Sequence, residues 1–170
     1  MALLETIRKR YSCRAYQEKA IEADKLAQVF EAARLAPSAK NLQDWRFVVV
    51  TDSKTKLQLA KAANNQMFLA KASAIIVACS NSEMVMTCGQ PIAQIDVSIA
   101  LEHICLQATE LGLATCWIGS FFSDKVRAIL GIPKNIEIIE LMSLGYPADE
   151  PNYLKRKPIE NILCYEKWQF

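Results

Sequence analysis

Three side chains that can hold a phosphate alternate near the amino terminus, in the stretch RKRYSCRAY at residues 8–16: Arg10, Ser12 and Arg14. Guanidinium groups and a serine hydroxyl can donate hydrogen bonds to phosphate oxygens, and the arginine bonds are charge-assisted. If this stretch is extended, side chains two residues apart project to the same side. A second basic cluster at 155–157 has the sequence KRK. The pattern predicts an anion site, and solvated surface charge is the alternative for both clusters.

A polar loop, PSAKNLQDW at residues 37–45, separates a predicted helix from a predicted strand. It presents serine, asparagine and glutamine side chains together with backbone amides. Such an edge can hold a planar heterocycle that carries hydrogen-bond donors and acceptors. A polar loop that ends on a core tryptophan explains the same residues equally well.

Several common chemistries find little support in this chain. The single histidine, His103, lies inside a predicted helix without a nucleophile elbow, so a serine or cysteine hydrolase is not expected. The five glycines form neither a P-loop nor a G-x-G-x-x-G turn. The six cysteines form no C-x-x-C pair, so we expect reduced thiols and no bound metal.

Composition narrows the possible partners. The chain has 170 residues, a formal net charge of +2 and 52% hydrophobic residues, which favours one globular domain over residues 1–170. A nearly balanced charge argues against binding to nucleic acid or to a membrane surface. The run AIIVAC at 74–79 is far too short to cross a bilayer, and the amino terminus does not read as a secretory signal. We therefore expect a cytoplasmic protein.

The predicted elements interleave along the chain. Apolar spacing and capping residues predict helices at 22–36, 53–63, 92–113 and 123–131, with Asp52 or Ser53 capping the second and Ser123 or Asp124 the last. Apolar and β-branched runs predict strands at 46–52, 72–80, 114–119 and 136–146. The helix at 92–113 is apolar on most of its circumference, which predicts burial nearly all round. The order favours an α/β or α+β sandwich around a mixed sheet.

The last 24 residues, 147–170, differ in character from the rest. They contain three prolines and show no helical period, yet they carry many large apolar side chains: Tyr153, Leu154, Ile159, Ile162, Leu163, Tyr165, Trp168 and Phe170. An extended segment this apolar is expected to lie along another surface. A partner subunit is the natural candidate.

Taken in order, these pieces resemble the nitroreductase family of FMN-dependent oxidoreductases over nearly the whole chain. The matching motifs are R-x-S-x-R at 10–14, P-S-x-x-N-x-Q-x-W at 37–45, NNQMFLAKASAIIVA at 64–78, ELGLATCWIGSF at 110–121, LGYP at 144–147 and KRKP at 155–158. The resemblance implies an α+β fold, with a mixed sheet sandwiched by helices. It also implies a homodimer that exchanges its C-terminal arms, residues 147–170, and holds FMN at the subunit interface.

The resemblance also assigns site residues, all of them for cofactor binding. Those expected on the FMN phosphate, ribityl chain or pyrimidine edge are Arg10, Ser12 and Arg14, with Arg156 and Lys155 completing the phosphate site. Those expected on the isoalloxazine from the other subunit are Pro37, Ser38 and Asn41. Asn65 is a further flavin contact, with Asn64 and Gln66 as alternatives for that place. Ile118 and Gly119 match the turn whose backbone amide approaches flavin N5.

The activity implied is transfer of a hydride from NADH or NADPH to the flavin and then to a nitroaromatic, a quinone or a related small-molecule acceptor, with ping-pong kinetics. The flavin carries the redox chemistry, so no catalytic side chain is expected. Alternatives are a relative that performs dehalogenation or enone reduction, an FMN carrier or sensor without turnover, and a small nucleic-acid-binding module. Three features depart from the family pattern: Tyr11, Asp44 and the short segment 81–91.

Overall fold

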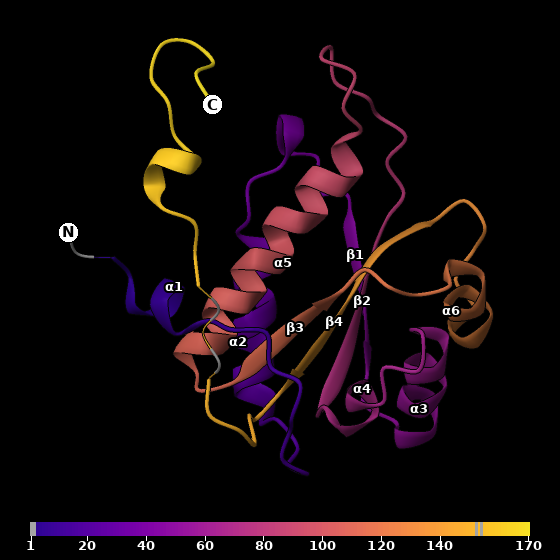
Figure 1. The fold of residues 1–170 in the computed structure, drawn as a ribbon. Helices are drawn as coiled ribbons and strands as arrows, with labels where there is room; N and C mark the ends of the chain where they lie inside the picture. Colours follow the sequence, from indigo (N-terminus) through magenta and orange to yellow (C-terminus); the bar gives the residue numbers. More distant parts are fainter. Residues whose placement is uncertain (1–2, 152, 154) are drawn as a thin grey trace.

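A four-stranded sheet forms the centre of the computed structural model, which describes residues 3–151, 153 and 155–170 (Figure 1). The predicted apolar residue Leu154 falls outside these residues. The strands are β1 (Trp45–Val50), β2 (Ala74–Ser80), β3 (Ala114–Ile118) and β4 (Glu137–Gly145), in the order β1-β2-β4-β3. All four strands lie where the sequence predicts them, and β3 is an edge strand.

The sheet is antiparallel, which corrects the expectation of a mixed sheet. Each neighbouring pair, β1 with β2, β2 with β4 and β3 with β4, runs antiparallel. Among the described residues, parallel pairing is confined to one isolated bridge between Ser12 and Thr115. The continuous apolar run in β2 indicates only that helices cover both faces of the strand. Helices do so here in an antiparallel sheet, so the run does not predict the strand direction.

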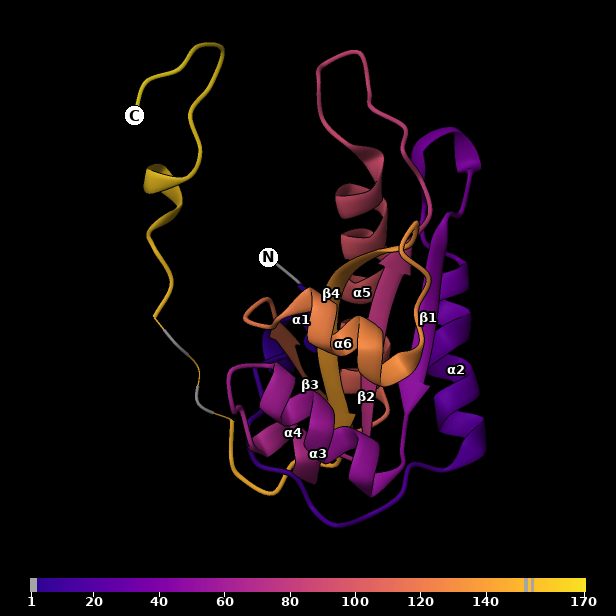
Figure 2. The same ribbon diagram turned by 90° about the vertical axis from the view of Figure 1, so that its right-hand side faces the viewer.

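Helices cover both faces of the sheet (Figures 1 and 2). Packed against one face are α2 (Ala23–Arg34) and α5 (Ile92–Glu110). Against the other face lie α3 (Ser53–Ala62), α4 (Phe68–Lys71) and α6 (Ser123–Leu130). The predicted α+β sandwich is therefore confirmed. The remaining short elements, α1 (Glu5–Lys9), η1 (Ala39–Asn41) and η2 (Ile159–Asn161), are not predicted by any periodicity.

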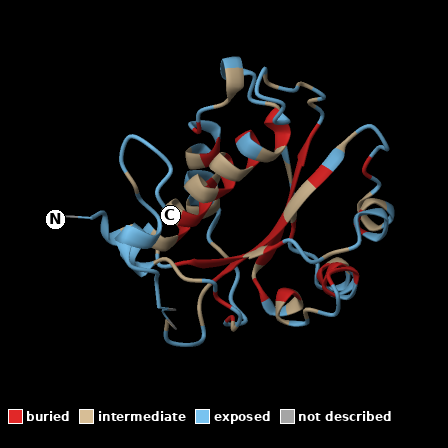
Figure 3. Cartoon of the chain, turned by 45° about the horizontal axis from the view of Figure 1, so that its top comes forward, coloured by how far each residue is buried: buried red, intermediate tan, exposed pale blue. Residues whose placement is uncertain are grey.

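Strand β2 joins two hydrophobic cores. All seven of its residues are buried, and the sheet is the most buried part of the chain (Figure 3). Ile76 and Ala78 pack on the α5 side, whereas Ile75 and Val77 pack on the side of α3 and α6. Alternation of side chains across the sheet therefore fills both layers from one strand.

Helix α5 is less enclosed than the sequence predicts. Val97, Ala100, Leu101 and Ile104 are fully buried against the sheet, but Ile95 is 39% exposed. The expectation of burial nearly all round is therefore wrong for the face that points away from the sheet. An apolar residue on that face can lie against solvent or against another protein surface, and sequence periodicity does not distinguish the two.

Helix caps show a mixed outcome. Asp52 caps α3, since its Oδ2 accepts a hydrogen bond from the Thr55 amide at 2.8 Å. Helix α6 begins after Phe122 without a side-chain cap, so neither Ser123 nor Asp124 plays the predicted role. Gly131 ends α6 in the left-handed conformation, at a φ of 66°, as a glycine stop requires.

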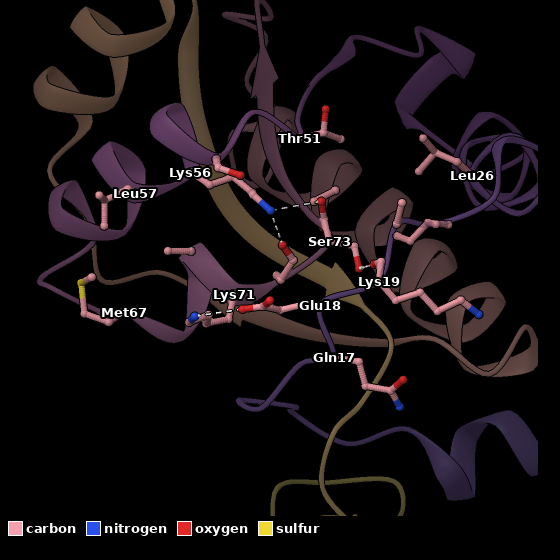
Figure 4. A pocket seen from close by; sticks show the side chains of 16 residues that line it. Gln17, Glu18, Lys19, Leu26, Thr51, Lys56, Leu57, Met67, Lys71 and Ser73 are labelled. Atoms are coloured by element: carbon pink, nitrogen blue, oxygen red, sulfur yellow. Dashed lines mark hydrogen bonds and ion pairs between the residues drawn. The ribbon is translucent and has the colours of Figure 1, made fainter.

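A cavity of about 800 Å³ lies at the end of the sheet where residues 17–21 pass α3 and the start of β2 (Figure 4). Its buried cation is Lys56, whose Nζ donates to the Ala72 carbonyl oxygen at 2.6 Å and approaches that of Ser73 at 3.5 Å. These carbonyls follow α4 and need a donor. Burial lowers the pKa of Lys56 below its ordinary value. We interpret Lys56 as a structural residue that satisfies the end of α4.

Replacing Lys56 by methionine is expected to destabilise the fold by about 1 kcal/mol at neutral pH, because the Ala72 carbonyl loses its donor. Between the lowered pKa of Lys56 and the ordinary value of 10.5, the unfolded chain binds more protons than the folded chain. Wild-type stability should therefore rise with pH relative to the variant. Urea unfolding from pH 7 to 10 measures this. The exposed Lys54→Met is the control, and a pH-independent difference for Lys56→Met would contradict the assignment.

Candidate functional site

The outer edge of β3 collects most of the predicted site. The Ser12 segment pairs with Thr115 of β3, and the Cys13 amide donates to the Thr115 carbonyl oxygen at 3.0 Å. The extended conformation predicted around Arg10, Ser12 and Arg14 is consistent with this pairing. The basic segment is thus fixed along the edge strand.

The serine and the second arginine of that segment lie close to the Cys116 thiol of β3. Burial raises the pKa of Cys116, while the charge of Arg14 and a hydrogen bond with Ser12 act in the opposite direction. Arg14 Nη1 also donates to the Ser12 carbonyl oxygen at 3.4 Å. Arg10 follows α1 directly and is half-buried. The structure therefore brings Ser12 and Arg14 together and places Arg10 at the start of the same segment.

The turn after β3 receives the asparagine segment that follows α3. Asn64 Nδ2 donates to Ser120 Oγ at 2.5 Å, and Gln66 Nε2 donates to the Ser120 carbonyl oxygen at 3.2 Å. Asn64 and Asn65 both have left-handed backbones, with φ of 52° and 58°, which asparagine tolerates better than most residues. Asn65 is exposed between its two anchored neighbours. The predicted proximity of residues 64–66 to the Gly119 turn is observed.

Successive residues of β3 point their backbone N–H and C=O groups to opposite edges of the strand, one toward β4 and the next toward the outside. Because the Thr115 carbonyl faces outward to Cys13, the peptide groups of Trp117 and then Gly119 face the same outer edge if the alternation continues. No acceptor pairs with the Gly119 amide among the described residues. An unpaired amide at a sheet edge is a hydrogen-bond donor available to a bound molecule.

A half-buried carboxyl group lies behind this turn and was not singled out from the sequence. Glu140 of β4 faces Gly119 closely enough that a Cβ built on Gly119 would lie 3.6 Å from Oε1 and 3.7 Å from Oε2. Glu140 Oε1 is buried without a hydrogen-bond partner in the described structure. Burial raises the pKa of Glu140 above its ordinary value. The available signal was the second of the two glutamates in the apolar strand IEIIELMSLG at 136–145.

The predicted loop with Pro37, Ser38 and Asn41 lies elsewhere in the chain. In both ribbon views the loop around η1 lies at the top of the molecule, apart from α1, which leads directly into the Arg10 segment (Figures 1 and 2). One chain therefore does not bring the two halves of the predicted site together. This separation agrees with the expectation that the loop serves the other subunit's site.

A buried carboxylate of α5 holds this loop in place. The Ala39 amide donates to both oxygens of Asp96, at 3.0 Å and 3.2 Å, and Asp96 is 4% exposed. Within the loop, the Gln43 amide donates to Ser38 Oγ at 3.0 Å. The backbones of Lys40, Asn41 and Gln43 are left-handed. The sequence does not reveal this role of Asp96, because its partner lies 57 residues away.

Lys155 and Arg156 lie exposed on the C-terminal arm, which stands away from the sheet (Figure 2). They do not meet the Arg10 segment within this chain's described contacts. The root of the arm is nevertheless fixed to that segment. The Tyr11 hydroxyl donates to the backbone carbonyl and Oδ1 of Asp149, at 3.3 Å and 3.4 Å, and the Ala148 amide donates to the Ala15 carbonyl at 2.9 Å. Tyr11, a departure from the family pattern, thus anchors the arm.

The arrangement favours ligand binding over side-chain nucleophilic chemistry. Burial raises the pKa of Cys13 and Cys116 and lifts that of Cys105 to about 11, so these thiols are protonated at neutral pH. His103 Nδ1 lies 3.1 Å from the Ala32 carbonyl oxygen, which is a contact between α5 and α2. No cluster of metal-ligating side chains occurs in the described residues. No helix in the same residues is long and apolar enough to span a membrane.

The residues present fit the phosphate and the ring of a flavin. Arginine and serine donors suit a phosphate, and the unpaired Gly119 amide suits an acceptor nitrogen on a planar ring. The cavity at Lys56 includes none of these residues among those that line it.

Sequence comparison identifies the group of proteins to which this arrangement belongs. The model of the Nitroreductase family matches residues 7–89 and 68–146. A protein of Archaeoglobus fulgidus, provisionally named NADH dehydrogenase/NAD(P)H nitroreductase, is 36% identical over 97% of this chain and 98% of its own.

Solved structures agree. A nitroreductase family protein of Clostridium difficile superposes with a TM-score of 0.88 at 35% identity, covering 99% of this chain and 100% of that one. An NADPH:FMN oxidoreductase of Vibrio harveyi, complexed with NAD⁺, has a TM-score of 0.90 at 26% identity, covering 98% of this chain and 77% of the other. With a family model that spans most of the sheet and its helices, and relatives that match end to end, the chain belongs to the nitroreductase family.

Proposed function

We propose that residues 1–170 form one FMN-binding domain of an NAD(P)H-dependent oxidoreductase that reduces nitroaromatics, quinones or related small acceptors. The observation that carries this proposal is the edge of β3, where the unpaired Gly119 amide and the Ser12–Arg14 segment lie along one strand. The name of the Vibrio harveyi relative, an NADPH:FMN oxidoreductase, supports FMN and a nicotinamide donor. Six free cysteines support a reducing, cytoplasmic location.

The residues divide the cofactor between them. Arg10, Ser12 and Arg14 would hold the phosphate, the ribityl chain or the pyrimidine edge, and Lys155 and Arg156 would complete the phosphate site from the arm. The anchored Asn64 and Gln66 keep Asn65 at the turn, where it would contact the flavin. The Ile118–Gly119 turn would present its backbone amide to N5. Charge-assisted donors and a fixed backbone amide together orient a flavin without a metal.

FMN, when bound, supplies the redox chemistry by accepting a hydride at N5 and passing it to the acceptor. The chain's own contribution is positioning and charge. Arg14 would stabilise the negative charge that reduction places near N1 and O2, because a nearby opposite charge favours the charged form. No residue has to act as a general base. The nicotinamide donor and the electron acceptor would use the same open side of the flavin site in turn.

We also propose that the functional unit is a homodimer with two FMN sites at the subunit interface. Supporting this, the loop around η1, with Pro37, Ser38 and Asn41, lies apart from α1 and the Arg10 segment that follows it, so a second copy is needed to unite them (Figure 1). The arm exposes large apolar side chains with nothing on its own domain to cover them: Ile159 64%, Ile162 61%, Tyr165 74%, Trp168 83% and Phe170 57%. Exposed apolar area of this kind marks an interaction surface.

The visible spectrum of the purified protein tests the function directly. We expect flavin absorption, bleaching by NADH or NADPH without oxygen, and recovery on adding a nitroaromatic or a quinone. A protein that binds FMN tightly without steady-state NAD(P)H oxidation would support a carrier or sensor. Turnover only of halogenated or enone acceptors would support those relatives. Absence of FMN binding, with salt-dependent binding to polyanions instead, would favour the nucleic-acid module.

Replacing Arg10 by alanine is expected to weaken FMN binding by about 30-fold, because a charge-assisted hydrogen bond to the phosphate is lost. Quenching of free FMN fluorescence on titration with apoprotein measures the dissociation constant. Arg8→Ala, which removes an exposed arginine of α1 two residues away, is the matched control and should bind as the wild type does. Equal affinity of the two variants would contradict the role given to Arg10.

Ending the chain at residue 157 is expected to convert the dimer to a monomer, because the apolar arm residues that would cover the partner are removed. Light scattering coupled to size exclusion, at one fixed protein concentration, measures the mass. Trp168→Asp should weaken the dimer in the same direction, whereas the exposed Lys167→Ala should not. A truncated protein of unchanged mass would show that another surface holds the dimer.

A further inference from the structure

The half-buried carboxyl group of Glu140 has no function in the scheme above. A β-bulge in β4 determines where it points: Ala78 pairs with Glu140 and Cys79 with Ile138, which leaves Ile139 as the extra residue. Ile138 packs on the α3 side, whereas Ile139 packs on the α5 side. Glu140 shares the α5 side with Ala78, its cross-strand partner. Bulges redirect side chains in this way and are frequent beside active sites.

The surroundings of Glu140 offer its Oε1 atom no donor. Ala78 lies opposite it and Met142 follows on the same face, both within the hydrophobic core. Two polar side chains of α5, on the same side of the sheet, are engaged elsewhere. Gln94 Nε2 donates to Glu137 Oε1 at 2.8 Å, and Asp96 accepts from the Ala39 amide. Gln94 Oε1 is itself a buried acceptor without a partner, so it offers no hydrogen to a carboxylate.

A buried carboxylate oxygen without a hydrogen-bond partner, such as Glu140 Oε1, is costly to the fold. Proteins retain such groups chiefly where the local charge has a function. The one backbone feature beside Glu140 that the function uses is Gly119, whose built Cβ would lie within 3.7 Å of both carboxylate oxygens. The oxygen without a partner therefore lies beside the turn that we assign to flavin N5.

We propose that Glu140 is a positioning residue of the cofactor site, which supports the Gly119 turn from the α5 side and whose negative charge disfavours the reduced flavin relative to the oxidised flavin. This inference rests on the proposed function. Arg14 and Glu140 then act in opposite directions on the same redox equilibrium. Arg14 stabilises the charge that reduction adds, and Glu140 repels it through surroundings of low polarity, where screening is weak.

The test is the midpoint potential of bound FMN, measured by spectroelectrochemistry, together with the dissociation constant of oxidised FMN. Glu140→Gln keeps the size and removes the charge. We expect reduced flavin to bind about tenfold more tightly relative to oxidised flavin, which for two electrons is a shift of about 30 mV to more positive potential. Glu140→Met, a second uncharged variant, should shift in the same direction and covers a failure of the first to fold.

Two controls isolate the charge at this position. Glu137→Gln removes an exposed carboxylate from the same strand and should leave the potential at the wild-type value. Glu140→Asp keeps the charge and should shift the potential less than either uncharged variant. A wild-type potential in Glu140→Gln, or an equal shift in Glu140→Asp and Glu140→Gln, would overturn the proposal. If the wild type binds no FMN, the proposed function fails as well, so the two failures are told apart by the wild-type spectrum.

Discussion

The free outer side of strand β3 is the constraint on which the rest of the candidate site depends. One side of this strand is bound to β4, and the other is available because β3 is last in the sheet order. An unpaired edge normally invites aggregation and has to be covered. Here the Ser12 segment covers the start of the edge, and the asparagine segment is bound to Ser120 beyond its end. The uncovered stretch between them includes the Gly119 amide, so the fold's unprotected edge and its candidate binding position coincide.

Asp96 and Glu140 show how differently a carboxylate can be used. Asp96 receives the Ala39 amide on both oxygens and so fixes a loop with three left-handed residues. The Ala39 amide compensates the charge of Asp96, and these hydrogen bonds make the loop rigid. Glu140 lacks a partner for Oε1, and its effect is a field at the Gly119 turn. Both act at a distance from any ligand, through the backbone segments that they support. The geometry of the site thus depends on residues from the second layer of the structure, in α5 and β4.

The sequence predicted the elements well because their signals are local. The all-apolar run of β2, the helical spacing of α2 and the glycine stop of α6 each depend on neighbouring residues. Strand direction, by contrast, depends on which strands become neighbours, and the sheet proved antiparallel. In the site, the motif residues were predicted by resemblance, but Asp96 and Glu140 were not. Their partners, Ala39 and Gly119, are far away in sequence, and the bulge that turns Glu140 leaves no pattern in the strand.

The attachment of the arm's root to the basic segment links two events that are usually considered separately. Tyr11 binds Asp149, and Ala15 binds Ala148, so the backbone around Arg14 and the beginning of the arm are ordered together. Any surface that immobilises the arm also reduces the conformational entropy left to the arginine segment. Part of the ordering cost of anion binding is then met before the anion arrives. If that surface is the second copy of the chain proposed above, affinity for the ligand depends on the protein concentration, and dilution lowers it.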